Sequence, residues 1–178
     1  NGSNTYITNN TGYMVISSEN GSTYNDANNH YFRTADSSEY MAKFLLNGAV
    51  ELYHNNHKSF NTNTNGITLT APEGGDCVLD MNSDEGDDNP DKWRINVTQG
   101  GSYQLKNYAD GSWENHIQST VNSAIELYHN GTKKFETTSN GVNVTGRLLA
   151  TGASGRGLIF NDDVKISLGS NNDLEIYH

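Results

Sequence analysis

The chain has little cysteine, proline or positive charge, and it has no long hydrophobic run. Among its 178 residues are one cysteine and two prolines. The single cysteine excludes an internal disulfide. No apolar stretch approaches the roughly 20 residues of a membrane span, so we expect no membrane insertion. Eleven Lys and Arg against 21 Asp and Glu give a net charge of -10, which would repel phosphate backbones. We therefore expect no nucleic-acid partner.

Apolar residues are also scarce, at 33% of the chain with a mean hydropathy of -0.73. This content is low for a core that one copy could enclose alone. Disordered chains are equally polar but poor in aromatic residues, which make up 10% here. Eighteen glycines, with many Asn, Ser and Thr, are typical of short strands joined by tight turns. We expect oligomerisation or stacking to complete the core.

One stretch recurs along the chain. Residues 124–146 read AIELYHNGTKKFETTSNGVNVTG, and residues 49–70 read AVELYHNNHKSFNTNTNGITLT, so that His129 corresponds to His54, 75 residues earlier. A third copy is divided between the two ends, with LEIYH closing the chain and NGSNTYITNNTGYMV opening it. This pattern indicates one supersecondary unit used repeatedly.

Each copy predicts a three-stranded antiparallel meander. Residues 125–129 alternate apolar and polar side chains, and Asn130-Gly131 then suits a type I′ hairpin turn. A second turn at Ser139-Asn140-Gly141 leads to the third strand. The apolar positions kept in both copies predict one shared, buried face. They are Ile125, Leu127, Phe135, Val142 and Val144, matched by Val50, Leu52, Phe60, Ile67 and Leu69.

The remaining segments predict further short strands, including Tyr31-Phe32-Arg33 and a hairpin arm at 41–46. Four alternating runs between residues 71 and 120 predict a second, four-stranded module, and the last strands are expected around Leu148-Leu149, 158–160, Val164 and Ile166. We expect five segments: 1–16, the second half of the divided repeat; 17–70, with the first full copy; 71–120, the second module; 121–146, the second full copy; and 147–178, ending in the first half of the divided repeat.

Several strings together resemble the recurring modules of tail-fibre and related virion structural proteins of tailed phages, especially marine and cyanobacterial ones. They are MAKFLLNGAVELYH, KKFETTSNGVNVTG, DEGDDNPDKWRI, NYADGSWE and DLEIYH with NGSNTYI. The resemblance implies a non-enzymatic fibre shaft or appendage, an interwoven parallel homotrimer built of repeated meanders. It also implies neighbouring fibre or tail proteins as partners and a place on the extracellular virion. A cellular surface filament is the alternative location.

The acidic run at residues 84–91 is a candidate cation site, because carboxylates gather there around a glycine as in a calcium loop. The candidate ligands are Asp84, Asp87, Asp88 and Asp91. Their spacing does not fit an EF-hand, and a solvated hairpin loop whose charge protects a sheet edge is the alternative. No other cofactor is expected. His54, His129 and His178 recur with the repeat and could meet on a threefold axis, but each precedes a turn, where polar residues are common.

No motif for a nucleophile, a phosphate loop or a zinc hydrolase occurs in the sequence, and we expect no enzyme activity. Two other functions stay open. Exposed Tyr103, Tyr108 and Trp113 could stack on a host cell-surface glycan, which would make the chain a receptor-binding or adhesin module. Acidic residues far apart in sequence could instead form a polysaccharide-cleaving site. The primary expectation is a structural shaft.

Overall fold

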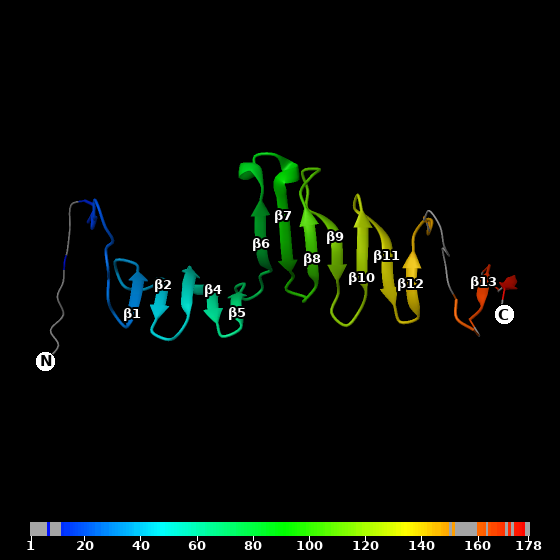
Figure 1. Ribbon diagram of the computed structural model, residues 1–178, viewed down its shortest axis with the longest axis horizontal. Coiled ribbons are helices and arrows are strands. Elements are labelled where there is room, and N and C mark those ends of the chain that lie inside the picture. The colour runs from blue at the N-terminus through cyan, green and yellow to red at the C-terminus, as the bar shows by residue number, and fades with distance from the viewer. Residues whose placement is uncertain are drawn as a thin grey trace. The chain divides into compact units, whose positions relative to one another are not determined.

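The computed structural model describes Ile7, residues 12–149, Thr151, residues 160–162 and 164–169, Asn171 and residues 173–176. The chain divides into two compact units, residues 1–74 and 75–178. The first unit holds a five-stranded antiparallel sheet whose strands pair in chain order (Figure 1). Its strands are β1 (Asn29–Arg33), β2 (Tyr40–Leu45), β3 (Val50–His54), β4 (His57–Asn63) and β5 (Gly66–Leu69).

The second unit holds a seven-stranded antiparallel sheet, again paired in chain order. Its strands are β6 (Cys77–Asn82), β7 (Lys92–Val97), β8 (Tyr103–Asn107), β9 (Glu114–Ser119), β10 (Ile125–His129), β11 (Thr132–Thr138) and β12 (Gly141–Val144). Two 3-10 turns, η1 (Asp84–Gly86) and η2 (Asn89–Asp91), connect β6 to β7, and β13 (Ile166–Leu168) pairs with β14 (Leu174–Ile176). The predicted all-β, antiparallel fold is therefore confirmed.

The predicted meanders form at both full copies of the repeat. Asn130 and Gly131 have φ of 46° and 64°, and Asn55 and Asn56 have 46° and 61°, as a type I′ turn requires. The hairpin arm expected at 41–46 is β2. The expected strand at Leu148-Leu149 is absent, since both residues lie outside any strand. Residues 158 and 159 fall outside the described part of the chain.

The second module and the second repeat copy share one sheet. Strand β9, the last run expected in the 71–120 segment, pairs with β10 through Leu127 opposite Ile117 and Ile125 opposite Ser119. The sequence predicts two separate segments here because the turn between them, Asn122-Ser123, lies at the same position of the repeat as Asn47-Gly48. Backbone pairing continues across that turn, so the repeat unit extends an existing sheet.

Each sheet is a single layer. Between described elements, the substantial contacts join neighbouring strands or the two 3-10 turns. No hydrophobic side chain among the described residues is buried. None of the helical turns in that part of the chain has the length or apolar content of a membrane span. The shared apolar face predicted from the repeat exists, but one copy of the chain leaves it open.

The turn between β7 and β8 depends on a glycine. Gly101 has φ of 83°, its N–H donates to the Thr98 carbonyl at 2.8 Å, and an added Cβ would lie 2.7 Å from Val121 Cγ2. We expect Gly101→Ala to lower the free energy of unfolding by about 1–2 kcal/mol, because alanine is strained at positive φ and meets a side chain. Thermal unfolding followed by circular dichroism measures this effect.

The neighbouring Gly100 provides the matched control. A Cβ there would meet nothing closer than Thr98 Oγ1 at 3.9 Å. Gly100→Ala should therefore leave the melting temperature nearly unchanged. Equal losses in the two variants would contradict the assigned turn geometry.

Candidate functional site

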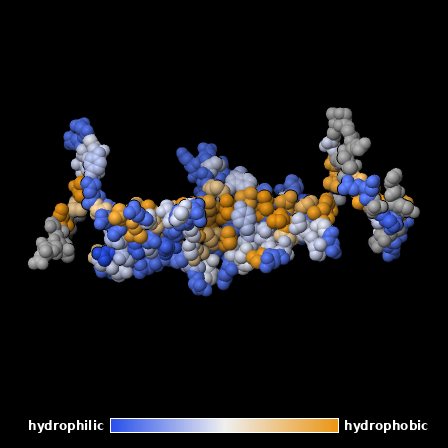
Figure 2. Space-filling view, turned by 60° about the horizontal axis from the view of Figure 1, so that its bottom comes forward, coloured by the Kyte–Doolittle hydropathy of each residue, from blue (hydrophilic) through white to orange (hydrophobic). Residues whose placement is uncertain are grey.

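The main candidate site is the open apolar face of the seven-stranded sheet. Register pairs place one apolar side chain from every strand in a row that crosses the sheet. This apolar row consists of Leu79, Ile95, Leu105, Ile117, Leu127, Phe135 and Val144. Leu79 is 43% exposed and Leu127 is 40% exposed. Figure 2 shows hydrophobic residues gathered over this sheet. An uncovered apolar face of this kind is a candidate interaction surface.

The five-stranded sheet has an equivalent row. Its register pairs align Phe32, Ala42, Leu52, Phe60 and Leu69 across all five strands. Leu52 and Phe60 correspond to Leu127 and Phe135 of the second copy, as the repeat predicts. Phe32 is 53% exposed. The two sheets therefore present the same type of surface, each from within its own unit.

The opposite face of each repeat copy carries a polar cluster. Tyr128 Oη donates to Glu126 Oε2 at 2.6 Å, and Lys133 Nζ donates to Glu126 Oε1 at 3.0 Å. Tyr53, Lys58 and Glu51 repeat these bonds at the same two distances. The tyrosine hydroxyl, followed by the lysine, lowers the pKa of each glutamate below its ordinary value. We call these two groups the Glu–Tyr–Lys clusters.

The Glu–Tyr–Lys clusters predict a pH dependence of stability. A carboxyl whose pKa is lowered by folding stabilises the folded chain above its unfolded pKa near 4.5, and this stabilisation is lost as the pH falls through the folded pKa. We expect Glu126→Gln to cost on the order of 1 kcal/mol at pH 7 and much less near pH 3. Melting temperatures across this pH range measure the difference.

Glu19→Gln serves as the control, because Glu19 is exposed before the first strand. This variant should follow the wild-type pH profile. If Glu126→Gln lost as much stability at pH 3 as at pH 7, its effect would come from packing, and the electrostatic role of Glu126 would be refuted.

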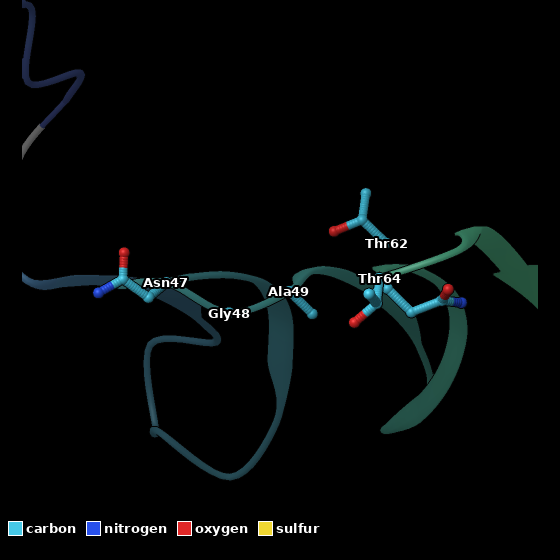
Figure 3. Close-up of a pocket in the computed structure, with 6 residues that line it drawn as sticks. Asn47, Gly48, Ala49, Thr62 and Thr64 are labelled. Carbon is cyan, nitrogen blue, oxygen red and sulfur yellow. The ribbon is translucent and has the colours of Figure 1, made fainter.

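A polar pocket recurs where β3 and β4 separate. The Val50 N–H donates to Thr62 Oγ1 at 2.9 Å, and in the second copy the Ile125 N–H donates to Thr137 Oγ1 at the same distance. A threonine hydroxyl thus accepts a strand N–H in both copies. Figure 3 shows Asn47, Gly48 and Ala49 along one side of the opening, with Thr62 and Thr64 across from them.

Each of these openings measures about 450 Å³, and the second is lined by the corresponding residues 122–124 and 137–139. The linings hold amides, hydroxyls and a methyl group, with no charged side chain among these residues. The openings follow from the local backbone geometry of the repeat. Their Ser and Thr hydroxyls have no acidic, basic or histidine side chain beside them in the lining.

The acidic loop brings together three of its four predicted ligands. Carboxylate oxygens of Asp87, Asp88 and Asp91 lie within 4.8 Å of one another, and Asp84 is not in this group. Asp84 begins η1 at φ of 41°. Oxygen donors at this spacing suit a hard divalent cation, and cation binding stays a prediction. The sequence could not separate Asp84 from the others, because the positive φ of residues 84–86 depends on the folded loop.

The three predicted glycan-stacking residues do not form one site. Tyr103 lies on the apolar face, where it pairs with Val97 and Ser119. Tyr108 and Trp113 are half-buried and lie together, with ring centroids 5.2 Å apart. The Arg94 guanidinium lies 4.1 Å from the Trp113 ring centroid and donates two hydrogen bonds to Asp80.

Two polar arrangements were missed by the sequence analysis. On the five-stranded sheet, Lys43 Nζ lies 3.8 Å from the Tyr40 ring centroid and 4.8 Å from that of Tyr53. On the seven-stranded sheet, the positions equivalent to Tyr40 and Lys43 are Asn115 and Gln118, which are joined by a 2.7 Å hydrogen bond. The signal that could have revealed both arrangements is the 75-residue spacing of the repeat. This spacing also relates β2 to β9, the strands that precede the two recognised copies.

The histidines of the repeat lie at strand ends. His54 pairs with His57, and His129 pairs with Thr132. Both are exposed. His178 falls outside the described residues, so the threefold metal site stays untested.

No family model matches the chain, and neither the comparison with curated proteins nor the comparison with solved structures found a match. Function must therefore be inferred from the surfaces described above.

Proposed function

We propose that the chain is a structural, non-catalytic segment of a phage tail fibre or related extracellular appendage, assembled as a parallel homotrimer. The resemblance of its sequence modules to tail-fibre repeats supports the biological setting. The two single-layer sheets support the structural role, because strands added in chain order extend a sheet without enclosing a cavity. Neighbouring fibre or tail proteins would be its partners.

One observation carries the proposal: no hydrophobic side chain among the described residues is buried. Leaving an apolar face in water forgoes about 25 cal/mol for every Å² that could be covered. A chain with two such faces gains stability when other copies cover them. Assembly would also place the Glu–Tyr–Lys clusters outward, where their charges remain hydrated.

The test is the native mass, measured by sedimentation equilibrium, with an unboiled denaturing gel of the same sample. We expect a mass three times the 19.5 kDa of one chain and a band that resists detergent until it is boiled. Incubation with bacterial surface polysaccharides should release no new reducing ends. A compact monomer that unfolds reversibly would refute the proposal, and release of reducing ends would refute its non-catalytic part.

The aromatic pair favours glycan recognition as a second candidate function. Tyr108 and Trp113 provide adjacent rings on the second unit, and a sugar ring gains by stacking on such surfaces. A glycan array with wild-type chain and Trp113→Ala tests this candidate. Saccharide binding that is lost in Trp113→Ala would support it, and no binding by the assembled wild type would exclude it for the saccharides on the array.

A further inference from the structure

We propose that Asn20 is a site of spontaneous modification, at which the side-chain amide is lost and the residue becomes aspartate or isoaspartate. The chemistry does not depend on the assembly proposed above. It requires an asparagine followed by a glycine, because the missing Cβ leaves the glycine nitrogen open to the asparagine side chain. Six such pairs occur in the chain, and the structure describes five of them. They begin at Asn20, Asn47, Asn65, Asn130 and Asn140, and the sixth, at Asn1, lies outside the described residues.

The reaction joins two atoms of neighbouring residues. The Gly21 nitrogen gives up its proton to solvent, attacks Cγ of Asn20 and closes a succinimide ring. The Cγ–Nδ2 bond breaks, and Nδ2 takes up a proton and leaves as ammonia. Water then opens the ring at Cγ to give aspartate, or at the backbone carbonyl carbon of residue 20 to give isoaspartate. Each product carries one more negative charge than asparagine, and water is the only co-reactant.

Four of the five described pairs lie in hairpin turns, where the fold opposes ring closure. We call these the turn pairs. Ring closure requires the ψ angle of the asparagine to rotate until the next nitrogen faces Cγ. Asn47 and Asn130 have φ of 52° and 46°, so their turns hold them in the left-handed region, away from that rotation. The Gly48 N–H also donates to the Leu45 carbonyl at 3.0 Å.

The other two turn pairs are restrained by strand pairing. Gly66 begins β5 opposite Asn63, and Gly141 begins β12 opposite Thr138. In the first of these turns the Asn65 N–H also donates to Asn63 Oδ1 at 2.9 Å. At each turn pair the reaction therefore has to wait for a local opening of the hairpin.

Asn20 has none of these restraints. It is exposed and lies outside any strand, in the polar stretch ahead of β1. Within the described part of the chain, neither Asn20 nor Gly21 makes a hydrogen bond or an ion pair. The Gly21 N–H is therefore available, and the backbone can rotate without breaking a strand pair. The folded chain should direct the reaction to residue 20.

The position of Asn20 also determines what the modification does. Isoaspartate adds a methylene to the backbone, which in a hairpin loop would disturb the turn and the strand register that depends on it. At residue 20 the added methylene and charge fall where no strand has to pair. Asn20 can thus accumulate the modification with age while both sheets keep their pairing.

Incubation of the full chain in mildly alkaline buffer, followed by peptide mapping with mass spectrometry, measures the loss of amide at each asparagine. In the folded chain Asn20 should react at least tenfold faster than every turn pair, which corresponds to about 1.4 kcal/mol or more of opening free energy. In concentrated guanidinium chloride this preference should disappear, because all five pairs then have the same local chemistry.

Gly21→Ala tests the route of the reaction. The added Cβ would meet only the flexible Ser18 side chain, with Oγ at 3.3 Å, so the variant should fold normally. It should lose the Asn20 amide several-fold more slowly than wild type, because the methyl group shields the attacking nitrogen. Gly100→Ala, far along the chain, should leave the rate at Asn20 unchanged.

Three results would overturn the proposal. The first is a turn pair that reacts as fast as Asn20 in the folded chain. The second is a preference for Asn20 that persists in denaturant, since the fold would then not be its cause. The third is an unchanged rate at Asn20 in Gly21→Ala, which would mean that water attacks the side chain directly.

Discussion

Replacing Asn107 with alanine should lower the free energy of unfolding of the second unit by about 3 kcal/mol. This corresponds to a fall in melting temperature of roughly 6 to 12 °C for a chain of this length. We expect this loss to be larger than that of any other single polar substitution discussed above. Its cause is the number of backbone groups that one side chain satisfies.

Asn107 is 6% exposed and ends β8. Its Nδ2 donates to the Pro90 carbonyl at 3.1 Å and to the Lys92 carbonyl at 3.0 Å, and its Oδ1 accepts from the Ala109 N–H at 2.9 Å. The side chain thus ties the end of the acidic loop to the start of the β8–β9 connection. Alanine would leave the Pro90 carbonyl and the Ala109 N–H without this partner, and each incurs a desolvation cost in a partly closed site. The Lys92 carbonyl would lose one of its two donors and keep the Tyr108 N–H at 3.1 Å.

Asn143→Ala provides the matched control, because exposed Asn143 makes one hydrogen bond, at 3.0 Å to Glu136 Oε1. It should change stability by less than about 0.5 kcal/mol. Hydrogen exchange adds a local readout, since Asn107→Ala should reduce protection at Ala109 and in the loop ahead of β7. Similar melting temperatures for the two variants would show that water replaces the Asn107 amide at little cost.

The strands and turns of the repeat were predictable because each depends on residues close in sequence. The alternation in 125–129 and the Asn130-Gly131 turn determine a hairpin with little tertiary information. The shared apolar face of Leu127, Phe135 and Val144 followed from the same period.

Features that depend on which strands become neighbours were not predictable in this way. The pairing of β9 with β10, the Lys43–Tyr40 contact and the exclusion of Asp84 from the acidic group each require partners set by the folded register. The separation of Tyr103 from Tyr108 has the same origin. They lie five residues apart on one strand and its extension, and strand geometry directs them to opposite faces.

The two repeat copies share a scaffold and differ in the chemistry of their outer faces. The Glu–Tyr–Lys clusters and the threonine hydroxyl bonds are kept at matching positions. One strand earlier, Tyr40 and Lys43 of one copy correspond to Asn115 and Gln118 of the other. Conserved contacts stabilise the meander itself, whereas the variable positions face away from the apolar row. Such a division allows the outer surface to change while the proposed contact between copies is retained.

The melting temperature should also depend on protein concentration. If three folded chains dissociate as they unfold, mass action links stability to the concentration of chains. With about 0.7 kcal/mol of unfolding enthalpy per residue, a trimer of 178-residue chains should gain about 3 °C in melting temperature for each tenfold increase in concentration. A monomer would show no change.

Calorimetry or circular dichroism from about 1 to 100 µM chain measures this slope, at a scan rate slow enough for melting and refolding to coincide. The slope gives the number of chains that dissociate on unfolding, and a substitution in the apolar row tests whether that row holds the chains together. Ile117→Lys should lower the melting temperature and abolish the slope, because its chains unfold as monomers. Asn143→Lys, on the opposite face of β12, should keep the wild-type slope even if its melting temperature falls slightly. A flat wild-type profile under reversible conditions would mean that each sheet is stable with its apolar row in water, and the hydrophobic argument for assembly would then fail.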